Sequence, residues 1–239
     1  MNELLKTTED GKIIAKTIPF SGVRKQIASN LYESLYVGVP NFSFVRADVS
    51  ALVELRKEYK EKGIKIGYTD IMIKLLAPAL AHSPYLNAAI SGKKIELYKS
   101  VNIAVGVSTE DDLLYAPVIR NVEEKNVLEI AEELKMLSDK VRNKTITLDD
   151  LSGGTFTFSS TGVYEIDGSD AIIPAPQSAI ITVGNIKDEV VVENKKIVIR
   201  PLTYLGFTVD HRVVQGVPLC KFIDAYLKCL KNPKPYLGI

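Results

Sequence analysis

The sequence lacks a dominant charge sign and has no apolar run long enough to cross a bilayer. Its 239 residues carry 30 basic and 29 acidic side chains, a formal net charge of +1. General nucleic-acid binders present a one-signed field, so we expect no nucleic-acid partner. The longest apolar stretch, residues 71–81, is broken by Lys74 and Pro78 and is shorter than the ~20 residues of a membrane span. We therefore expect no membrane association.

Cysteine and histidine are also scarce. Cys220 and Cys229 are nine residues apart in a predicted helix, which puts them on opposite faces and excludes a disulfide between them. No Cys-x-x-Cys or His-x-x-x-His spacing is present, so we predict no metal site. Only His82 and His211 could supply imidazole acid–base chemistry. The first residues do not resemble an export leader, and we expect a cytoplasmic protein.

The pattern of apolar residues predicts one mixed domain, residues 19–239, after an extended N-terminal arm, residues 1–18. Ser50 and Thr69 are the expected N-caps of two helices. We predict helices over residues 23–37, 52–62, 71–81, 126–141 and 217–230, and strands over 41–50, 88–90, 95–98, 101–107, 113–119, 155–159, 179–183, 190–192, 197–199 and 203–209. Uneven alternation of helices and hairpins favours an α+β two-layer sandwich, a mixed sheet with helices on one face, over a doubly wound sheet.

Two segments carry residues with chemical potential. His211 lies at a predicted strand-to-helix junction within Val-Asp-His-Arg-Val-Val-Gln-Gly, residues 209–216. Ser159 lies at a predicted strand end within Gly-Gly-Thr-Phe-Thr-Phe-Ser-Ser-Thr-Gly, residues 153–162, where a hydroxyl could donate to a developing oxyanion. Taken singly, each has an ordinary alternative: a structural histidine at a junction, or a polar loop. His82 ends an apolar helix, and we interpret it as structural.

Together the two segments resemble the catalytic core of the dihydrolipoamide acyltransferases, the central components of 2-oxoacid dehydrogenase complexes. The likeness extends through Ile-Pro-Phe-Ser-Gly-Val-Arg-Lys, residues 18–25, Pro-Tyr-Leu-Asn-Ala, residues 84–88, and Pro-Gln-Ser-Ala-Ile, residues 176–180. The resemblance implies a fold like chloramphenicol acetyltransferase and an acyl transfer between dihydrolipoamide and coenzyme A. It also implies homotrimers with the active site at a subunit interface, and a larger polyhedral core built from those trimers.

The resemblance assigns roles to particular residues. His211 matches the family's general base, and Ser159 matches the hydroxyl that stabilises the tetrahedral oxyanion. Residues at positions where the family contacts coenzyme A are Arg56, Ser159, Ser160, Gly184 and Ile186, with Thr69 nearby.

One departure concerns the support of the histidine. Gln215 stands where the family pattern has aspartate, and a glutamine can form hydrogen bonds but cannot stabilise an imidazolium by charge. Arg24 resembles the arginine that pairs with this aspartate in related folds. We expect Gln215→Asp to act mainly by pairing with Arg24, and so to raise stability more than turnover.

The family also implies the molecules around the core. Coenzyme A is the co-substrate, and lipoamide is the acyl donor, carried by a lipoyl domain outside this chain. The other expected partners are the decarboxylase and dihydrolipoamide dehydrogenase components. Two alternatives stay open: an assembly scaffold with impaired catalysis, and a free-standing acetyltransferase of the same fold acting on a small acceptor. Which acyl group is moved (acetyl, succinyl or branched) does not follow from the sequence.

Overall fold

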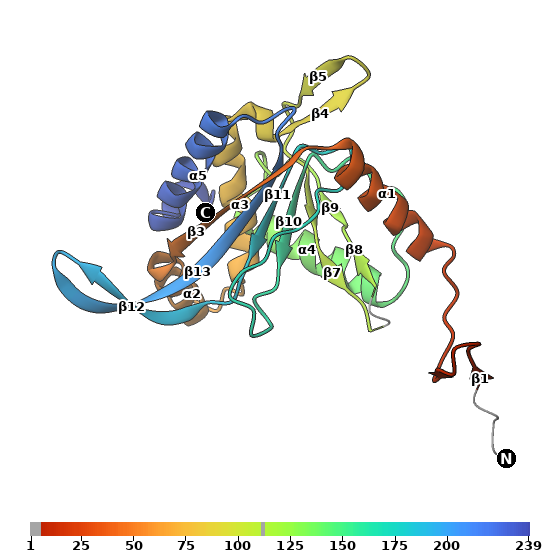
Figure 1. The fold of residues 1–239 in the computed structure, drawn as a ribbon. Coiled ribbons are helices and arrows are strands. Elements are labelled where there is room, and N and C mark those ends of the chain that lie inside the picture. The colour runs from red at the N-terminus through yellow and green to blue at the C-terminus, as the bar shows by residue number, and fades with distance from the viewer. Residues whose placement is uncertain (1–5, 111–112) are drawn as a thin grey trace.

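The computed structural model describes residues 6–110 and 113–239, which fold around one mixed sheet (Figure 1). The strand order is β12-β13-β11-β10-β6-β9, and β3 pairs with the free side of β13. β10 runs parallel to both of its neighbours, β6 and β11, and the other pairings of this sheet are antiparallel. The strands of this sheet are β3 (Pro40–Asp48), β6 (Ile103–Val105), β9 (Val118–Ile119), β10 (Phe156–Ser160), β11 (Ala179–Val183), β12 (Lys187–Glu193) and β13 (Lys196–Asp210).

A helical layer covers one face of the sheet, which confirms the expected α+β sandwich. It consists of α2 (Ser50–Glu61), α3 (Tyr68–Ala81), α4 (Val127–Arg142) and α5 (Gly216–Lys231). Asn126 begins α4 because its side chain accepts hydrogen bonds from the backbone of Leu128 and Glu129, while Glu129 bonds back to Asn126. None of the helices in residues 6–110 and 113–239 is long and apolar enough to cross a membrane.

The core between the layers is aromatic at its centre. Phe156 and Phe207 of the sheet pack against Phe222 of α5, with ring centroids 5.9 and 5.8 Å apart, and Tyr226 stacks on Phe222 at 5.9 Å. All four side chains are buried. The hydroxyl of Tyr226 donates to the carbonyl of Met72 at 3.1 Å, so the one polar atom of this cluster is satisfied.

Helix α3 is apolar on nearly every side and is buried, as its composition predicts. Its one charged residue in the buried part is Lys74, whose Nζ donates to the carbonyls of Val122 at 3.1 Å and Glu123 at 3.3 Å. Burial lowers the pKa of Lys74, and the carboxylates of Glu123 and Glu129 oppose that shift. The ammonium therefore ties α3 to the loop before α4.

The second face of the sheet is covered by residues 161–178. Thr157 donates to the side chain of Gln177 at 2.6 Å, and the hydroxyl of Thr182 donates to the carbonyl of Ser169. Gly206 of β13 permits this close approach, because a Cβ there would overlap the backbone oxygen of Ser169 and the hydroxyl of Thr182. The segment that follows Ser159 is thus packed onto the sheet.

Three small antiparallel pairs lie outside the main sheet: β1 (Lys6–Thr7) with β2 (Ile13–Ile14), β4 (Ala88–Ser91) with β5 (Lys94–Leu97), and β7 (Val107–Ser108) with β8 (Leu114–Tyr115). The short helices η1 (Pro84–Leu86) and η2 (Lys234–Tyr236) complete the elements. The arm precedes α1 (Val23–Val37) and projects from the body, as Figure 1 shows. It carries the β1–β2 pair rather than being wholly extended. The domain boundary at residue 18 stays a prediction.

Several predicted boundaries were wrong. The N-caps are Val49 and Gly67 rather than Ser50 and Thr69. Ser50 lies inside α2 because its hydroxyl and its N–H both bond to the Asp48 carboxylate, at 2.6 and 2.9 Å. The predicted strands 197–199 and 203–209 are one strand, β13, whereas residues 101–107 and 113–119 each form two short strands.

The aromatic core yields a stability prediction. Phe222→Ala removes a fully buried ring from between the layers, and we expect it to destabilise the fold by about 3–5 kcal/mol. Phe20→Ala, at an exposed position of the arm, should change the free energy of unfolding by less than about 0.5 kcal/mol. Urea unfolding of both variants measures the difference, and equal losses would show that the Phe222 contacts do not anchor the core.

Candidate functional site

His211 follows the last residue of β13 and is held there by its backbone. Its N–H donates to the carbonyl of Val39 at 2.8 Å, and the preceding N–H, of Asp210, donates to the carbonyl of Ser178 at 2.8 Å. The chain therefore leaves the sheet between the end of α1 and the segment 161–178. The imidazole is half-buried at this junction, where it keeps access to solvent.

A buried carboxylate beside His211, which the sequence interpretation missed, fixes the turn into α5. Asp210 accepts two hydrogen bonds from Arg212 Nε at 3.0 Å and one from its Nη2 at 2.6 Å. It also accepts the backbone N–H groups of Arg212 at 3.0 Å and Val39 at 3.4 Å. Burial pushes the pKa of Asp210 up, but the bonds from Arg212 and Val39 outweigh it, and the pKa lies below its usual value of 3.8.

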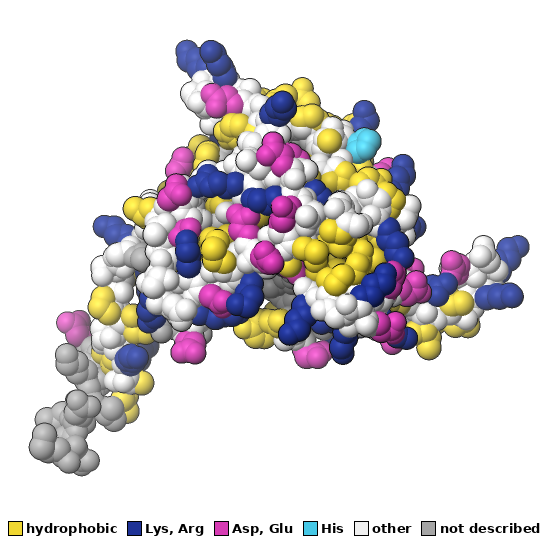
Figure 2. Space-filling model, turned by 180° about the vertical axis from the view of Figure 1, so that it is seen from behind, with side chains coloured by type: hydrophobic (Ala, Val, Ile, Leu, Met, Phe, Trp, Pro, Cys, Tyr) yellow, Lys and Arg dark blue, Asp and Glu magenta, His cyan; other side chains and the backbone are white. Residues whose placement is uncertain are grey.

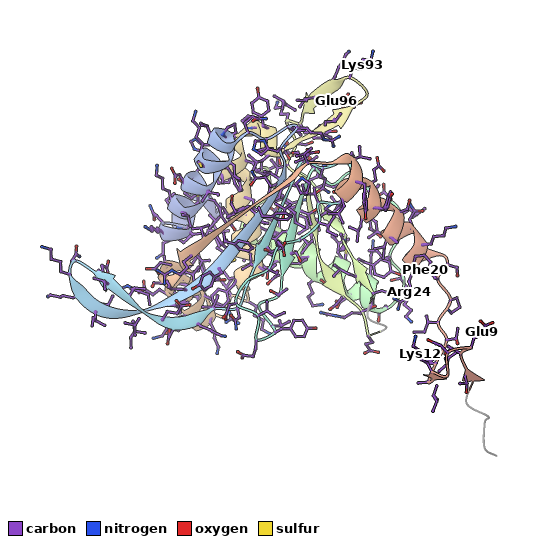
Figure 3. The ribbon with its side chains drawn as sticks, viewed as in Figure 1. Glu9, Lys12, Phe20, Arg24, Lys93 and Glu96 are labelled. Atoms are coloured by element: carbon purple, nitrogen blue, oxygen red, sulfur yellow. The ribbon has the colours of Figure 1, made fainter. Side chains whose placement is uncertain are left out.

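Gln215 also acts on the backbone of His211. Its Nε2 donates to the carbonyl of His211 at 2.8 Å, across the first turn leading into α5. The expected partner of position 215, Arg24, lies at the opposite end of α1 (labelled in Figure 3), about 20 Å of helix from the end that meets His211. Within one chain, Gln215 therefore supports the histidine main chain and does not reach Arg24.

A cavity of about 130 Å³ opens beside this junction. Apolar side chains line it, among them Val37 at the end of α1 and Val39 of the link to β3. Charged side chains of both signs also line it, Glu33 of α1 and Arg212 of the turn before α5. Across residues 6–110 and 113–239, no group of three or more His, Cys, Asp or Glu side chains is placed to hold a metal ion.

Ser159 and Ser160 are the last residues of β10 and lie at a different level of the sheet from His211. Ser159 is half-buried and faces the backbone of Gly106, where a Cβ would lie 3.4 Å from its hydroxyl. The hydroxyl of Ser160 accepts the N–H of Gly162 at 3.2 Å. Because β10 and β11 are parallel neighbours, with Ser160 level with Val183, the predicted residues Gly184 and Ile186 follow at the same edge.

Gly184 has a structural requirement of its own. A side chain there would overlap the backbone oxygen of Asp167, and its carbonyl accepts the buried hydroxyl of Thr203 at 3.0 Å. The predicted residues Arg56 and Thr69 belong instead to the helical layer, on α2 and α3. The guanidinium of Arg56 stacks over the ring of Tyr68 at 4.8 Å.

One chain does not bring Ser159 and His211 together. Ser159 is level with Thr182, and Thr182 is level with Gly206 of β13. His211 lies five residues beyond Gly206, about 16 Å along the strand, and β13 is two strands, about 10 Å, from β10. A base and an oxyanion donor must both contact the reacting group, so these two residues of one chain cannot serve the same substrate.

The family follows from comparison with known proteins. The model of the 2-oxoacid dehydrogenases acyltransferase (catalytic domain) matches residues 14–237. The chain belongs to this family. A lipoamide acyltransferase component of the branched-chain alpha-keto acid dehydrogenase complex of Bacillus subtilis is 36% identical over 91% of the chain. A yeast succinyltransferase component of the 2-oxoglutarate dehydrogenase complex, from Saccharomyces cerevisiae, is 35% identical over 92%. The chain spans about half the length of these curated relatives, 52% and 48%.

Solved structures of family members match the whole fold. The cubic core of a pyruvate dehydrogenase multienzyme complex has a TM-score of 0.89 at 27% identity, covering 99% of this chain and 100% of its own. A chloramphenicol acetyltransferase, 12% identical with a TM-score of 0.55, covers 84% of this chain and 94% of its own and shows the shared fold.

A third structure bears on the candidate residues. It is a dihydrolipoamide acetyltransferase of Azotobacter vinelandii, 28% identical with a TM-score of 0.88, covering 96% of both chains. A serine, a histidine 52 residues later and an asparagine four residues after that were investigated for roles in its catalytic mechanism. Ser159, His211 and Gln215 have the same spacings, 211 − 159 = 52 and 215 − 211 = 4. An amide therefore occupies the position of Gln215 in that acetyltransferase too.

Asp210 gives a pH-dependent prediction. Asp210→Asn keeps the shape but removes the charge that binds Arg212, and we expect a loss of about 1–3 kcal/mol in unfolding free energy at pH 7. Because folding lowers the pKa of Asp210, its contribution is complete above pH 3.8 and disappears as the pH falls through the folded-state value.

The difference between wild type and Asp210→Asn should therefore close below about pH 3.8, as thermal or urea melts across pH 2–7 would show. Asp188→Asn, at an exposed position of β12, serves as the matched control and should cost little at any pH. A gap that persists unchanged at pH 2 would contradict the ion-pair explanation.

Proposed function

We propose that this chain catalyses acyl transfer between dihydrolipoamide and coenzyme A, as the oligomeric core of a 2-oxoacid dehydrogenase complex. The observation that carries the proposal is the Ser159–His211–Gln215 spacing, which matches the serine, histidine and asparagine studied in the Azotobacter acetyltransferase. The half-buried hydroxyl of Ser159 at the end of β10 supports the proposal as a hydrogen-bond donor for a thioester.

The chemistry begins with a thiol that is mostly protonated. A free thiol with a pKa near 8.5 is only about 3% ionised at pH 7, so attack requires a base. His211 takes the proton of the coenzyme A thiol, and the thiolate sulfur attacks the carbonyl carbon of acyl-dihydrolipoamide. The hydroxyl of Ser159 donates to the oxyanion of the tetrahedral intermediate. The carbon–sulfur bond to lipoamide then breaks, and His211 returns the proton to the departing sulfur.

A second copy must complete this site, because Ser159 and His211 of one chain are too far apart to act together. We propose a homotrimer, in which each site combines Ser159 of one copy with His211 of the next, and trimers that build a polyhedral core. The relative whose structure is a cubic core, covered over its whole length, supports the larger assembly.

The remaining ligands follow from the same reaction. Coenzyme A would contact Arg56, Ser159, Ser160, Gly184 and Ile186, and the acyl group would arrive on the lipoamide of a lipoyl domain. The decarboxylase and dihydrolipoamide dehydrogenase components would complete the cycle, in the cytoplasm. The alternative of a scaffold with impaired catalysis rests on Gln215, which replaces the aspartate of the family pattern. The Azotobacter acetyltransferase has an asparagine at the matching spacing, so an amide at this position does not favour the scaffold.

Replacing the two proposed catalytic residues tests the mechanism. His211→Ala should lower turnover by about 10²–10⁴-fold, as expected for a lost general base, and Ser159→Ala by about 10²–10³-fold. The assay is acyl transfer between acetyl-, succinyl- or branched acyl-coenzyme A and dihydrolipoamide, with unchanged melting temperature as the folding check. His82→Ala, at the other histidine, should leave turnover unaltered. Wild-type turnover in His211→Ala would sink the assignment.

Gln215 is proposed as a positioning residue that acts through the carbonyl of His211. Gln215→Leu removes the amide donor, and we expect turnover to fall about 2–13-fold, the value of one hydrogen bond of roughly 0.5–1.5 kcal/mol. Gln215→Asn keeps an amide, as in the Azotobacter relative, and should restore most of the loss. Turnover measured against pH separates the roles: a positioning residue lowers the plateau, and a shifted pH profile in Gln215→Leu would instead indicate direct contact with the imidazole.

A further inference from the structure

The turn that follows Ser160 holds two large apolar side chains in solvent. Val163 is 87% exposed and Tyr164 is 60% exposed, and we call these two residues the turn surface. They come directly after Ser159 and Ser160, at the end of β10 where the chain leaves the sheet (Figure 1). Ligand sites combine apolar side chains with a few placed polar groups, so the turn surface is a candidate extension of the Ser159 site.

Backbone hydrogen bonds fix this turn against β11. The N–H of Thr161 donates to the carbonyl of Val183 at 2.9 Å, and the N–H of Tyr164 closes the turn by donating to the carbonyl of Thr161 at 2.9 Å. Further along, the N–H of Asn185 donates to the carbonyl of Ile166 at 3.0 Å. The turn surface is therefore presented by a backbone that the sheet already holds, which reduces the entropy cost of binding a ligand.

The same segment covers Gly184. A Cβ on Gly184 would overlap the backbone oxygen of Asp167, and one on Gly162 would lie 3.2 Å from the carbonyl oxygen of Gly184. Gly184 is buried as a result, whereas the turn surface is exposed. A ligand that approaches the end of β11 from solvent thus meets the turn surface before it meets Gly184.

Charge decides which part of coenzyme A suits the turn. Nζ of Lys187 pairs with the carboxylates of Asp167 at 2.7 Å and Glu165 at 3.3 Å, and its hydrogen bonds to these groups raise the pKa of Lys187. Two carboxylates and one ammonium give the segment a net negative charge, which repels the phosphate groups of coenzyme A. The pantetheine arm is uncharged and carries a pair of methyl groups, so it suits an apolar surface.

The reverse side of the molecule does not offer the phosphate groups a better surface. Figure 2 shows Lys and Arg interspersed with Asp and Glu among the described side chains visible from behind. A ligand with several phosphates favours a surface of one sign. The charge distribution on that side therefore gives no reason to move coenzyme A away from the Ser159 edge.

The length of the pantetheine arm matches the distance from Ser159 to the turn. Thr161 is at most about 7 Å from Ser159 along an extended chain, and the two ends of a turn lie within about 7 Å of each other. Tyr164 therefore lies within about 14 Å of Ser159. In pantetheine, the carbon that bears the methyl groups is about ten bonds from the sulfur, or about 12 Å in an extended chain. With the sulfur at Ser159, these methyl groups reach the level of the turn surface.

We propose that Val163 and Tyr164 bind the pantetheine arm of coenzyme A and so hold its thiol at Ser159. The inference rests on the proposed function, because it takes coenzyme A as the acyl acceptor. The Tyr164 ring and the Val163 methyl groups pack against the methyl groups of the arm. This contact is the same in the bound substrate and in the transition state, so it lowers the KM for coenzyme A and leaves kcat unchanged.

Acceptor thiols of three lengths test the contact. Wild type and Tyr164→Ala are compared with coenzyme A, with pantetheine and with N-acetylcysteamine, whose acetyl group ends about 6 Å from the sulfur and does not reach the turn. We expect Tyr164→Ala to raise the KM for coenzyme A and for pantetheine about 3–10-fold at unchanged kcat, as for losing part of one buried aromatic side chain. The kcat/KM for N-acetylcysteamine should stay the same. Tyr164→Phe keeps the ring and should keep the wild-type KM.

A control and a second variant accompany this comparison. Leu148→Ala, at an 86% exposed position in the loop after α4, should leave every KM unchanged. Val163→Ala should raise the same two KM values by a smaller factor, and it replaces Tyr164→Ala should that variant lower the melting temperature. An increase for coenzyme A alone would place Tyr164 against the nucleotide, and an equal change for all three acceptors would indicate a general disturbance. Either result overturns the proposal.

Calorimetry separates this inference from the proposed function. Tyr164→Ala should raise the Kd of coenzyme A and of pantetheine by the same factor as the KM, whereas adenosine bisphosphate, which lacks the arm, should bind both proteins equally. A wild type that binds coenzyme A through Tyr164 but transfers no acyl group would contradict the catalytic proposal and leave the contact standing. Acyl transfer with identical Kd values in wild type and Tyr164→Ala would overturn the inference alone. Absence of coenzyme A binding would overturn both.

Discussion

The register of one long strand is the constraint on which the rest of the structure depends. β13 begins in the projecting hairpin, passes through the sheet between β11 and β3, and ends at His211. Every position along it is fixed relative to β10 by the intervening β11. The separation of the proposed base from the proposed oxyanion donor is therefore not a detail of two side chains. It is built into the hydrogen bonds of the sheet, and no rotamer change can remove it.

The same strand shows how polar groups position the site. The carboxylate of Asp210 binds Arg212 and the N–H of Val39, while Gln215 binds the carbonyl of His211. The backbone of His211 is thus held by Val39 of the link between α1 and β3 and by Gln215, the N-cap of α5, while the neighbouring Asp210 is held by Ser178. For His211 as the proposed base, a main chain held in place before substrate arrives lowers the entropy cost of reaching the reactive geometry.

Much of the fold could be predicted from the sequence because apolar periodicity and turn residues act locally. The helix from Asn126, the buried helix over residues 71–81 and the β4–β5 hairpin all follow such local patterns. The N-caps at Ser50 and Thr69 could not be predicted. The Asp48 carboxylate accepts the hydroxyl of Ser50, and the Asp70 carboxylate accepts the N–H of Gly67, so the caps are Val49 and Gly67, one and two residues earlier. The motif of residues 209–216 indicated His211, but the partners of Asp210 and Gln215 depend on where the chain turns. That Ser159 and His211 lie at different levels of the sheet depends on strand order, which periodicity does not encode.

Lys74 has a consequence for the order in which the chain acquires its structure. Helix α3 is otherwise so apolar that it would be expected to bury itself as soon as it forms, yet its ammonium is bound by the carbonyls of Val122 and Glu123. Those acceptors lie almost fifty residues later in the chain. During synthesis, α3 emerges before these carbonyls, with its ammonium hydrated by water, and burying that charge without an acceptor is costly. We therefore expect α3 to become buried only after the loop before α4 has been synthesised, because that loop supplies the acceptors of Lys74.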